Sequence, residues 1–418
     1  MNKHRMNQEL SRFAARLRET IHGRDAALRR PDSAARCPYQ ESEFNSLALE
    51  LFALQFASNA AYRKICEARG LTLAVFEHWT QIPAVPTSAF KELELSCIPP
   101  EERTAVFHSS GTTEQKPSRH FHCPESLDLY EGFLWSWFEQ NILTDLRFTI
   151  YDLRLETKSA IGNQQSAIFM TPPPARAPHS SLVHMFETVR RKLGAPESVF
   201  VGQIDTDGAW ILDFNAALAA LNDNLKFKIQ NSKLVFGTAF SFVHLLDFLV
   251  ERDLRVELPA GSHVMETGGY KNRSRSMPKA ELHALITERL GVPAENIVCE
   301  YGMSELSSQA YAPGAPASRR RFVASTTKEL AGETPALPGP VTRHFCFPPW
   351  ACAQIISPET GREVADGETG LIRVFDLANV FSVAAIQTED LGIRRGNGFE
   401  LIGRAQLAEP RGCSLMTA

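Results

Sequence analysis

Residues 107–117 read FHSSGTTEQKP, and this stretch carries the clearest chemical signal in the chain. Gly111 permits backbone conformations and close approaches that a side chain would block. The surrounding hydroxyls and backbone N–H groups can donate hydrogen bonds to an anion, and Lys116 adds a positive charge. These hydroxyls belong to Ser109, Ser110, Thr112 and Thr113. The apolar residues 105–107 predict a short strand that leads into a phosphate-holding loop. An ordinary solvated turn is the alternative.

The loop differs from a Walker P-loop, because no Gly-Lys-Ser/Thr follows four residues after a glycine. Nearby histidines at positions 108, 120 and 122 fit no standard zinc spacing, and we expect them to be polar loop residues.

The whole-chain numbers exclude several classes of protein. The 418 residues are enough for two or three domains, and the net charge of −4 creates no field that attracts nucleic acid. The sequence has no secretory apolar segment and no apolar run long enough for a membrane span. Eight cysteines at irregular spacing indicate free thiols more than a disulfide framework. We therefore expect a cytoplasmic protein.

Periodicity divides the chain into four segments. Residues 1–100 show apolar positions at helical spacing and predict an N-terminal helical region. Residues 101–345 alternate short apolar runs with helical patterns, which predicts an α/β core. The runs that predict strands are 146–153, 167–170, 198–203 and 233–236, and the helical patterns are 182–193, 240–251 and 280–290. Residues 346–405 predict a small β-rich subdomain with turns at Asp366-Gly367 and Asn397-Gly398. Residues 406–418 are expected to be a flexible tail that carries Cys413.

Three further segments suit nucleotide chemistry. Residues 300–305, EYGMSE, follow an apolar strand-like run and place an aromatic ring beside a glycine and a carboxylate, which suits base stacking and Mg²⁺ binding. Residues 387–392, QTEDLG, place a carboxylate where it could accept the two hydroxyls of a ribose. Residues 266–270, ETGGY, would let a flat ring lie against bare backbone. Each segment also has an ordinary structural alternative. For residues 300–305 it is a buried tyrosine with a surface glutamate, for 387–392 a strand-end turn, and for 266–270 a hairpin.

Together and in this order, these segments resemble the adenylate-forming superfamily of acyl- and aryl-CoA ligases, luciferases and peptide-synthetase adenylation domains. That family reads Ser-Ser-Gly-Thr-Thr-Gly-x-Pro-Lys, Gly-Gly, Tyr-Gly-x-Thr-Glu, Thr-Gly-Asp-Leu and Gly-Arg. The matching segments here are 109–113, 268–269, 301–305, 388–391 and 403–404.

The resemblance implies a role for each motif residue. Ser109–Thr113 and Lys116 would hold the β- and γ-phosphates of ATP, and Glu305 would hold Mg²⁺. Asp390 would accept the ribose hydroxyls. The adenine pocket would include Gly268, Gly269 and Tyr301, and Gly302, Ser304 and Arg404 would also bind the cofactor. The family also often places a histidine near the substrate carboxylate, a position that His184 matches, with a half-buried helix histidine as the alternative.

The motifs also depart from the family pattern. Glu114 replaces a glycine, and Lys116-Pro117 inverts the Pro-Lys order, so Arg119 is an alternative partner for the phosphate charge. Glu389 likewise stands where the family has glycine.

The last departure concerns the C-terminal segment. Superfamily members usually continue beyond Gly-Arg into a mobile domain with a catalytic lysine, whereas this sequence ends fifteen residues after Gly403. In this respect it is similar to acyl-protein synthetases (LuxE type), near the phenylacetate-CoA ligases. We therefore expect a large N-terminal domain of two α/β subdomains plus the β-rich subdomain, without the full mobile domain.

The same branch implies a role for Cys413. Its members carry their acyl group on such a cysteine, and a thiolate is a strong nucleophile toward an acyl adenylate. The alternative is a free thiol on a frayed terminus. The expected activity is ATP-dependent activation of a carboxylic acid, a fatty acid first, followed by transfer to Cys413 and then to an acyl reductase or a carrier protein. Two alternatives stay open: a compact phenylacetate-type CoA ligase, and a non-catalytic nucleotide- or acyl-binding protein.

Overall fold

A six-stranded sheet forms the centre of the α/β region. The computed structural model describes residues 3–24, 41–71, 76–109, 116–143, 165–222, 231–269, 275–314 and 343–405. In these residues the strand order is β11-β10-β9-β8-β4-β5, and all neighbours are parallel except β10 and β11. The strands are β4 (Ser166–Phe169), β5 (Val199–Phe200), β8 (Lys233–Thr238), β9 (His263–Thr267), β10 (Ile297–Tyr301) and β11 (Ala310–Ala312).

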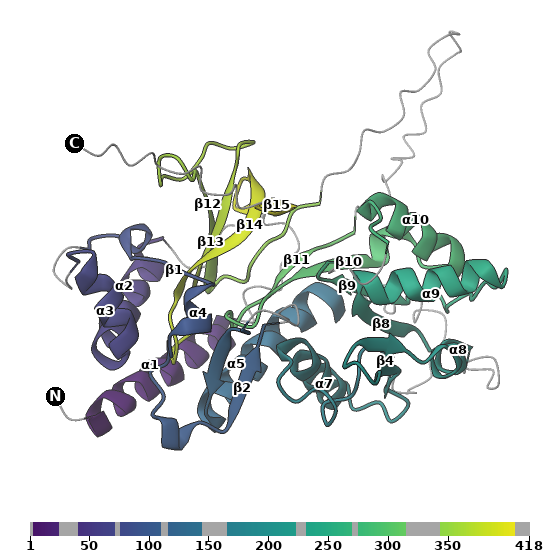
Figure 1. Ribbon diagram of the computed structural model, residues 1–418, viewed down its shortest axis with the longest axis horizontal. Helices are drawn as coiled ribbons and strands as arrows, with labels where there is room; N and C mark the ends of the chain where they lie inside the picture. Colours follow the sequence, from purple (N-terminus) through teal and green to yellow (C-terminus); the bar gives the residue numbers. More distant parts are fainter. Residues whose placement is uncertain are drawn as a thin grey trace, which may run out of the picture.

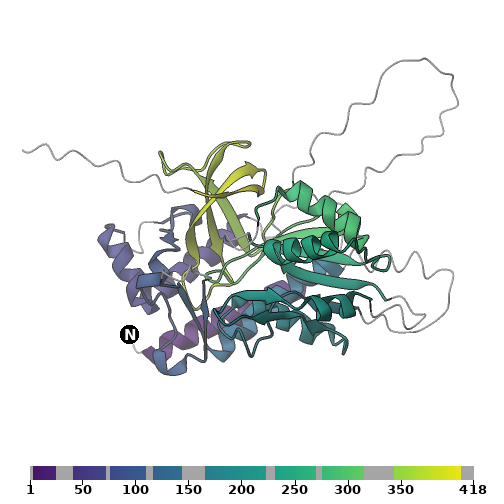
Figure 2. The same ribbon diagram turned by 45° about the vertical axis from the view of Figure 1, so that its right-hand side comes forward.

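Helices cover both faces of this sheet (Figure 1 and Figure 2). Successive strand residues point to opposite faces, so Val264 and Ile297 pack with one helix layer while Met265 and Val298 pack with the other. The first layer contains α8 (Phe214–Asn222), α9 (Ala239–Glu251) and α10 (Lys279–Leu290). The second contains α5 (Pro124–Phe138) and α7 (Ser181–Leu193). Burial on both faces explains why these strands read as continuous apolar runs.

Local signals set the limits of the helices. The Ser180 side chain accepts a hydrogen bond from the backbone N–H of Val183 and caps α7. Gly194 and Gly291 end α7 and α10 in the left-handed conformation, which glycine adopts readily. The helices predicted near 182–193, 240–251 and 280–290 and the strands predicted near 167–170 and 233–236 are therefore confirmed. A further strand predicted at 146–153 lies outside the described residues.

The second sheet has five strands in the order β1-β14-β13-β12, with β15 paired to β14 (Figure 1). They are β1 (Val85–Pro86), β12 (Ala351–Ile356), β13 (Thr369–Asp376), β14 (Ala385–Arg395) and β15 (Gly398–Arg404). The predicted turns connect β12 to β13 and β14 to β15. The strand β1 comes from the first hundred residues and pairs in parallel with β14.

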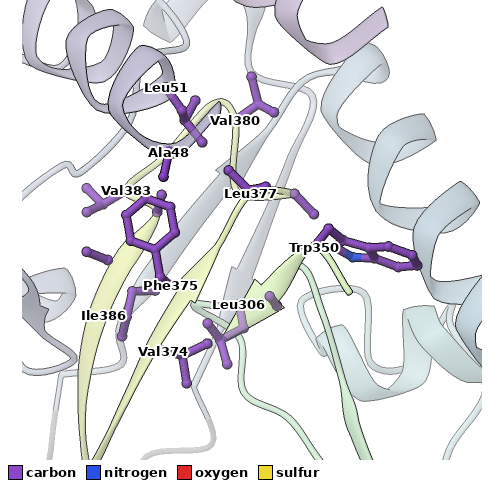
Figure 3. Packing of buried hydrophobic residues seen from close by; sticks show 14 of the residues in the cluster. Ala48, Leu51, Leu306, Trp350, Val374, Phe375, Leu377, Val380, Val383 and Ile386 are labelled. Atoms are coloured by element: carbon purple, nitrogen blue, oxygen red, sulfur yellow. The ribbon is translucent and has the colours of Figure 1, made fainter. Parts of the chain in front are cut away.

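The N-terminal helices share one hydrophobic core with this second sheet. They are α1 (Lys3–Arg24), α2 (Glu41–Ser58), α3 (Ala60–Ala68) and α4 (Ala89–Glu92). Figure 3 shows Ala48 and Leu51 of α2 beside Phe375 and Val383 of the sheet region. The helical region and the β-rich sheet thus pack as one unit, and the limits of the four predicted segments stay a prediction.

Short elements complete the described chain. They are the hairpin strands β2 (Ala105–His108) and β3 (Arg119–His122), the pair β6 (Gly202–Ile204) and β7 (Trp210–Leu212), and the turns of helix η2 (Trp79–Gln81), η3 (Pro100–Glu102), η4 (Glu139–Leu143) and η6 (Ala294–Asn296). Among the helices of the described ranges, none is both long and apolar enough to cross a membrane.

Candidate active site

The motif residues gather where two parallel strands end. Thr267 of β9 and Glu300 of β10 are register partners, so Gly268 and Tyr301 leave the sheet side by side. Gly268 has a φ of +67°, a conformation that favours glycine. The carboxyl ends of parallel strands are the usual ligand-binding edge of an α/β sheet. The two strand ends therefore form one wall of a candidate site.

A hydrogen bond joins this wall to the second sheet. The hydroxyl of Tyr301 donates to Oδ2 of Asp390 on β14 at 2.9 Å. The N–H of Asp390 donates to Oγ1 of Thr388, and Arg404 on the paired strand places its Nε 3.8 Å from Asp390 Oδ1. Burial raises the pKa of Asp390, while the Tyr301 hydrogen bond and the Arg404 charge act in the opposite direction. Tyr301, Asp390 and Arg404, predicted from separate motifs, thus lie together.

Gly302 has a steric reason for its identity. A Cβ atom at this position would lie 2.4 Å from Oε1 of Glu300. The buried Glu300 carboxylate accepts a hydrogen bond from the Thr267 hydroxyl. Burial raises the pKa of Glu300 to about 7, although this hydrogen bond lowers it. The Tyr-Gly pair of the motif therefore places a glycine directly over a buried carboxyl group.

The predicted phosphate loop connects the two strands of the β2–β3 hairpin. Ser109 Oγ accepts a hydrogen bond from the backbone N–H of Ser118 at 3.0 Å, and the Ser109 N–H donates to the Ser118 carbonyl at 3.3 Å. These bonds close the base of the loop. Four predicted phosphate ligands lie outside the described residues, namely Ser110, Gly111, Thr112 and Thr113.

The base of the hairpin contacts the turn after β10. Ser118 Oγ lies 3.4 Å from Ser304 Oγ, which donates to Glu305 Oε2 at 2.9 Å. His120 Nδ1 lies 2.6 Å from the Ser304 carbonyl oxygen, and Asn379 Nδ2 donates to the Glu305 carbonyl at 2.8 Å. The Glu305 carboxylate is therefore held beside the β2–β3 hairpin.

The two candidate phosphate cations pair with surface carboxylates. Lys116 Nζ lies 3.2 Å from Glu92 Oε2, and both side chains are more than half exposed. An Arg119 guanidinium nitrogen lies 3.7 Å from Glu94 Oε1. An exposed ion pair such as Lys116–Glu92 is weak and exchanges readily. Both cations lie on the hairpin, but no contact links them to Glu305 or Asp390 within the described residues.

His184 lies against the strand that enters the loop. Its ring centroid is 5.1 Å from that of Phe107, and its Nε2 is 2.9 Å from Glu131 Oε1. Arg191 also binds this carboxylate, at 2.8 Å. Burial lowers the pKa of His184, and Glu131 opposes that effect. His184 is thus placed behind the hairpin, with no contact to the Tyr301–Asp390 pair among the described residues.

Three residues that the sequence analysis did not select hold the site together. They are Ser118, His120 and Asn379, which fix the hairpin and the Glu305 turn. The prediction that His108, His120 and His122 are polar loop residues was wrong, because His108 lies on β2 and the other two lie buried on β3. Burial lowers the pKa of His120 to about 4, so the ring is neutral at neutral pH. For the two buried histidines, the available signal is their spacing of two positions, which puts both on one face of a strand.

A scan against models of protein families finds no match. The chain is similar to the long-chain-fatty-acid–luciferin-component ligase of Aliivibrio fischeri, with 23% identity over 397 residues that cover 90% of this chain and 87% of that protein. It is also 22% identical to the ligase of the same name from Vibrio harveyi, over 377 residues that cover 86% and 83% of the two chains.

A solved structure shares the fold. The structure of 2-hydroxyisobutyryl-CoA ligase in complex with 2-HIB-AMP and CoA superposes with a TM-score of 0.54 and 12% identity, over 87% of this chain and 68% of that one. The predicted fold class is thereby confirmed: this is the α/β fold of adenylate-forming enzymes. Over most of its length the chain is thus similar to two long-chain-fatty-acid–luciferin-component ligases, and it shares the fold of an adenylate-forming CoA ligase.

Proposed function

We propose that the chain activates a fatty acid with ATP and transfers the acyl group to the thiol of Cys413. The single observation that carries this proposal is the convergence of Tyr301 and Asp390 with the hairpin–Glu305 contact at one edge of the sheet. The long match to two fatty-acid ligases supports the choice of substrate.

In the first step, a carboxylate oxygen of the acid attacks the α-phosphorus of ATP, and the bond to pyrophosphate breaks. Asp390 would accept the ribose hydroxyls, while Gly268, Gly269 and Tyr301 would border the adenine. The hairpin hydroxyls would donate hydrogen bonds to the phosphates. Lys116 would neutralise part of the phosphate charge once it leaves Glu92. Alignment and charge neutralisation account for most catalysis of this type.

Glu305 fits a magnesium ligand. Mg²⁺ prefers one or two carboxylates together with substrate phosphates, and the Glu305 carboxylate is held beside the phosphate hairpin by Ser304. When bound there, the ion would supply positive charge to the phosphate oxygens.

In the second step, the Cys413 thiolate attacks the acyl carbonyl. The acyl–phosphate bond breaks, AMP leaves, and the thiol proton passes to solvent. We place this reaction in the cytoplasm, where ATP is supplied and thiols stay reduced. The thioester would then pass to an acyl reductase or an acyl-carrier protein. His184 would act by positioning Phe107 and the hairpin, or the acid itself.

Acyl labelling tests the transfer. Protein incubated with ATP, Mg²⁺ and a labelled long-chain fatty acid should carry one hydroxylamine-sensitive acyl group per chain. Cys413→Ser should abolish that label while acyl-AMP still forms, and the adjacent change Ser414→Ala should leave the label intact. Labelling of Cys413→Ser at the wild-type level would contradict the proposal. Acyl-CoA formed at an undiminished rate by Cys413→Ser would identify a CoA ligase instead.

A further inference from the structure

A second cluster of chemically active side chains lies inside the fold, behind the strand ends. It consists of Glu266 on β9, His283 on α10 and Cys299 on β10, all buried. Glu266 and Cys299 are register partners on adjacent parallel strands, so their side chains point to the same face. The helix α10 covers that face (Figure 2).

The distances within this cluster match those of a tetrahedral metal site. Glu266 Oε2 lies 3.3 Å from His283 Nε2 and 3.3 Å from Cys299 Sγ, and Cys299 Sγ lies 3.8 Å from His283 Nε2. Zinc bonds of about 2.0–2.3 Å at tetrahedral angles place neighbouring ligand atoms roughly 3.3–3.6 Å apart. One ion could therefore bind all three atoms with only small side-chain movements.

We propose that Glu266, His283 and Cys299 bind one Zn²⁺ ion that stabilises this part of the fold. Thiolate, imidazole and carboxylate form a ligand set that suits zinc and disfavours the hard cation Mg²⁺. A second observation supports a ligand here: Glu266 Oε1 is fully buried, and within the described ranges it has no hydrogen-bond partner. This oxygen would face the ion beside Oε2 of the same carboxylate and could contact it as a second, weaker donor.

The charges around the cluster allow a divalent cation. The thiolate and the carboxylate together supply the two negative charges that balance the ion. Two cations face them: Lys279 Nζ lies 3.6 Å from Glu266 Oε2, and Arg343 approaches Cys299 Sγ at 3.8 Å. The Lys279 side chain is 44% exposed, so it can turn into solvent when the ion binds. Arg343 can keep donating to the metal-bound sulfur as an outer partner.

The position of the cluster determines its role. Glu266 stands two residues before Gly268, and Cys299 stands two residues before Tyr301. An ion bound by β9, β10 and α10 would fix the strand ends that form the adenine side of the candidate site. The ligands are buried, so the ion would have a structural role and would not contact substrate. This site is separate from the proposed Mg²⁺ ligand Glu305 and does not depend on the proposed function.

Cobalt substitution tests the site in the full-length protein. Cys37→Ser/Cys413→Ser serves as the background, so that no thiol outside the described residues binds the probe. Metal-free protein titrated with Co²⁺ should bind one ion and develop a thiolate-to-cobalt charge-transfer band together with the visible bands of tetrahedral cobalt. Added Zn²⁺ should displace the cobalt, and added Mg²⁺ should not.

Matched variants locate the ligands. In that background, Cys299→Ser should abolish the charge-transfer band, and both Cys299→Ser and His283→Gln should weaken Co²⁺ binding by about 100-fold or more. The control Cys66→Ser changes another fully buried thiol and should leave affinity within about twofold. Removing zinc with a chelator should lower the melting temperature of the background protein and leave that of Cys299→Ser unchanged.

The proposal is overturned if the folded background protein shows no charge-transfer band at saturating Co²⁺. That measurement needs no variant of the cluster, so it stands even if Cys299→Ser does not fold. An unchanged band in Cys299→Ser would overturn it equally. Either result would leave a hydrogen-bonded polar cluster in which the Cys299 thiol donates to Glu266.

Discussion

The two sides of the proposed nucleotide site, a ribose side and a phosphate side, are held in different ways. On the ribose side, the buried Tyr301 donates a hydrogen bond to the partly buried Asp390, and this bond joins the two sheets. On the phosphate side, Lys116 pairs with Glu92 at the surface, where 52% and 69% of the two side chains are exposed. The ribose side is therefore preorganised by the fold. On the phosphate side, Lys116 would have to leave Glu92 before it could bind a phosphate. We expect substitutions on the ribose side to affect binding and stability, and those on the phosphate side to affect mainly the rate.

The largest effect should come from Asp390→Ala. This change removes the carboxylate that would accept charge-assisted hydrogen bonds from the ribose, each worth about 1.5–3 kcal/mol, and leaves the Tyr301 hydroxyl without its acceptor. We expect the KM for ATP to rise about 100-fold or more in steady-state kinetics. Glu389→Ala removes the neighbouring carboxylate and should change the KM less than about threefold. Equal effects of the two changes would contradict the assignment of Asp390 to the ribose hydroxyls.

Gly302→Ala should destabilise the ribose side. The added methyl group would lie 2.4 Å from the Glu300 carboxylate, and such overpacking costs about 1–3 kcal/mol. Urea denaturation measures the loss. Gly269→Ala, whose added methyl group meets no atom of the described residues within 4 Å, should cost less than about 1 kcal/mol. Adding Glu300→Ala to Gly302→Ala should relieve the clash; if the two losses simply add, this steric account is wrong.

The pH dependence of stability tests the burial of Glu300. Its pKa is raised from 4.5 to about 7 by burial, so the folded state binds this proton more tightly than the unfolded state. The resulting stabilisation is complete below about pH 4.5 and is lost as the pH rises through 7. Glu300→Gln should therefore reduce the fall in unfolding free energy between pH 5 and pH 8 by up to about 3 kcal/mol. Urea denaturation at both pH values measures this fall, and an identical fall in the two proteins would contradict the assignment.

Lys116→Met should have the smallest effect on the fold. An exposed ion pair contributes about 0–1 kcal/mol, so the unfolding free energy should stay within about 0.5 kcal/mol of wild type. The rate of adenylate formation should fall about tenfold, because one phosphate charge is lost. Glu92→Gln releases the lysine without removing it and should not lower that rate. A loss of stability above about 1 kcal/mol in Lys116→Met would show that the lysine is part of the folded framework.

Local patterns predicted most of the α/β core but not the contacts between distant segments. The helices α7, α9 and α10 and the strand β10 follow from periodicity and flanking residues, because those signals act over a few positions. The strand β1 was not predicted, since two residues that include a proline carry no strand pattern, and their partner lies in β14.

In the candidate site, too, local motifs were predictable and contacts between distant segments were not. The motifs predicted Tyr301, Asp390 and Glu305 as site residues. The structure places Tyr301 against Asp390, and Glu305 accepts a hydrogen bond from Ser304, which contacts Ser118. The contact between Ser118 and Ser304 joins residues 186 positions apart, which no spacing rule reveals. The sequence analysis did not predict the Glu266–His283–Cys299 cluster for a similar reason: its members come from two strands and a helix and are irregularly spaced in the sequence.

Carboxylate-dependent exchange of labelled pyrophosphate into ATP tests the central claim most directly. The full-length protein, assayed with Mg²⁺ and a series of straight-chain acids, should catalyse exchange only when an acid is present, fastest with a long-chain acid. Asp390→Ala should reduce exchange about 100-fold at an ATP concentration below the wild-type KM. Absence of exchange with every acid, in protein that binds ATP, would contradict the claim that this site forms an acyl adenylate.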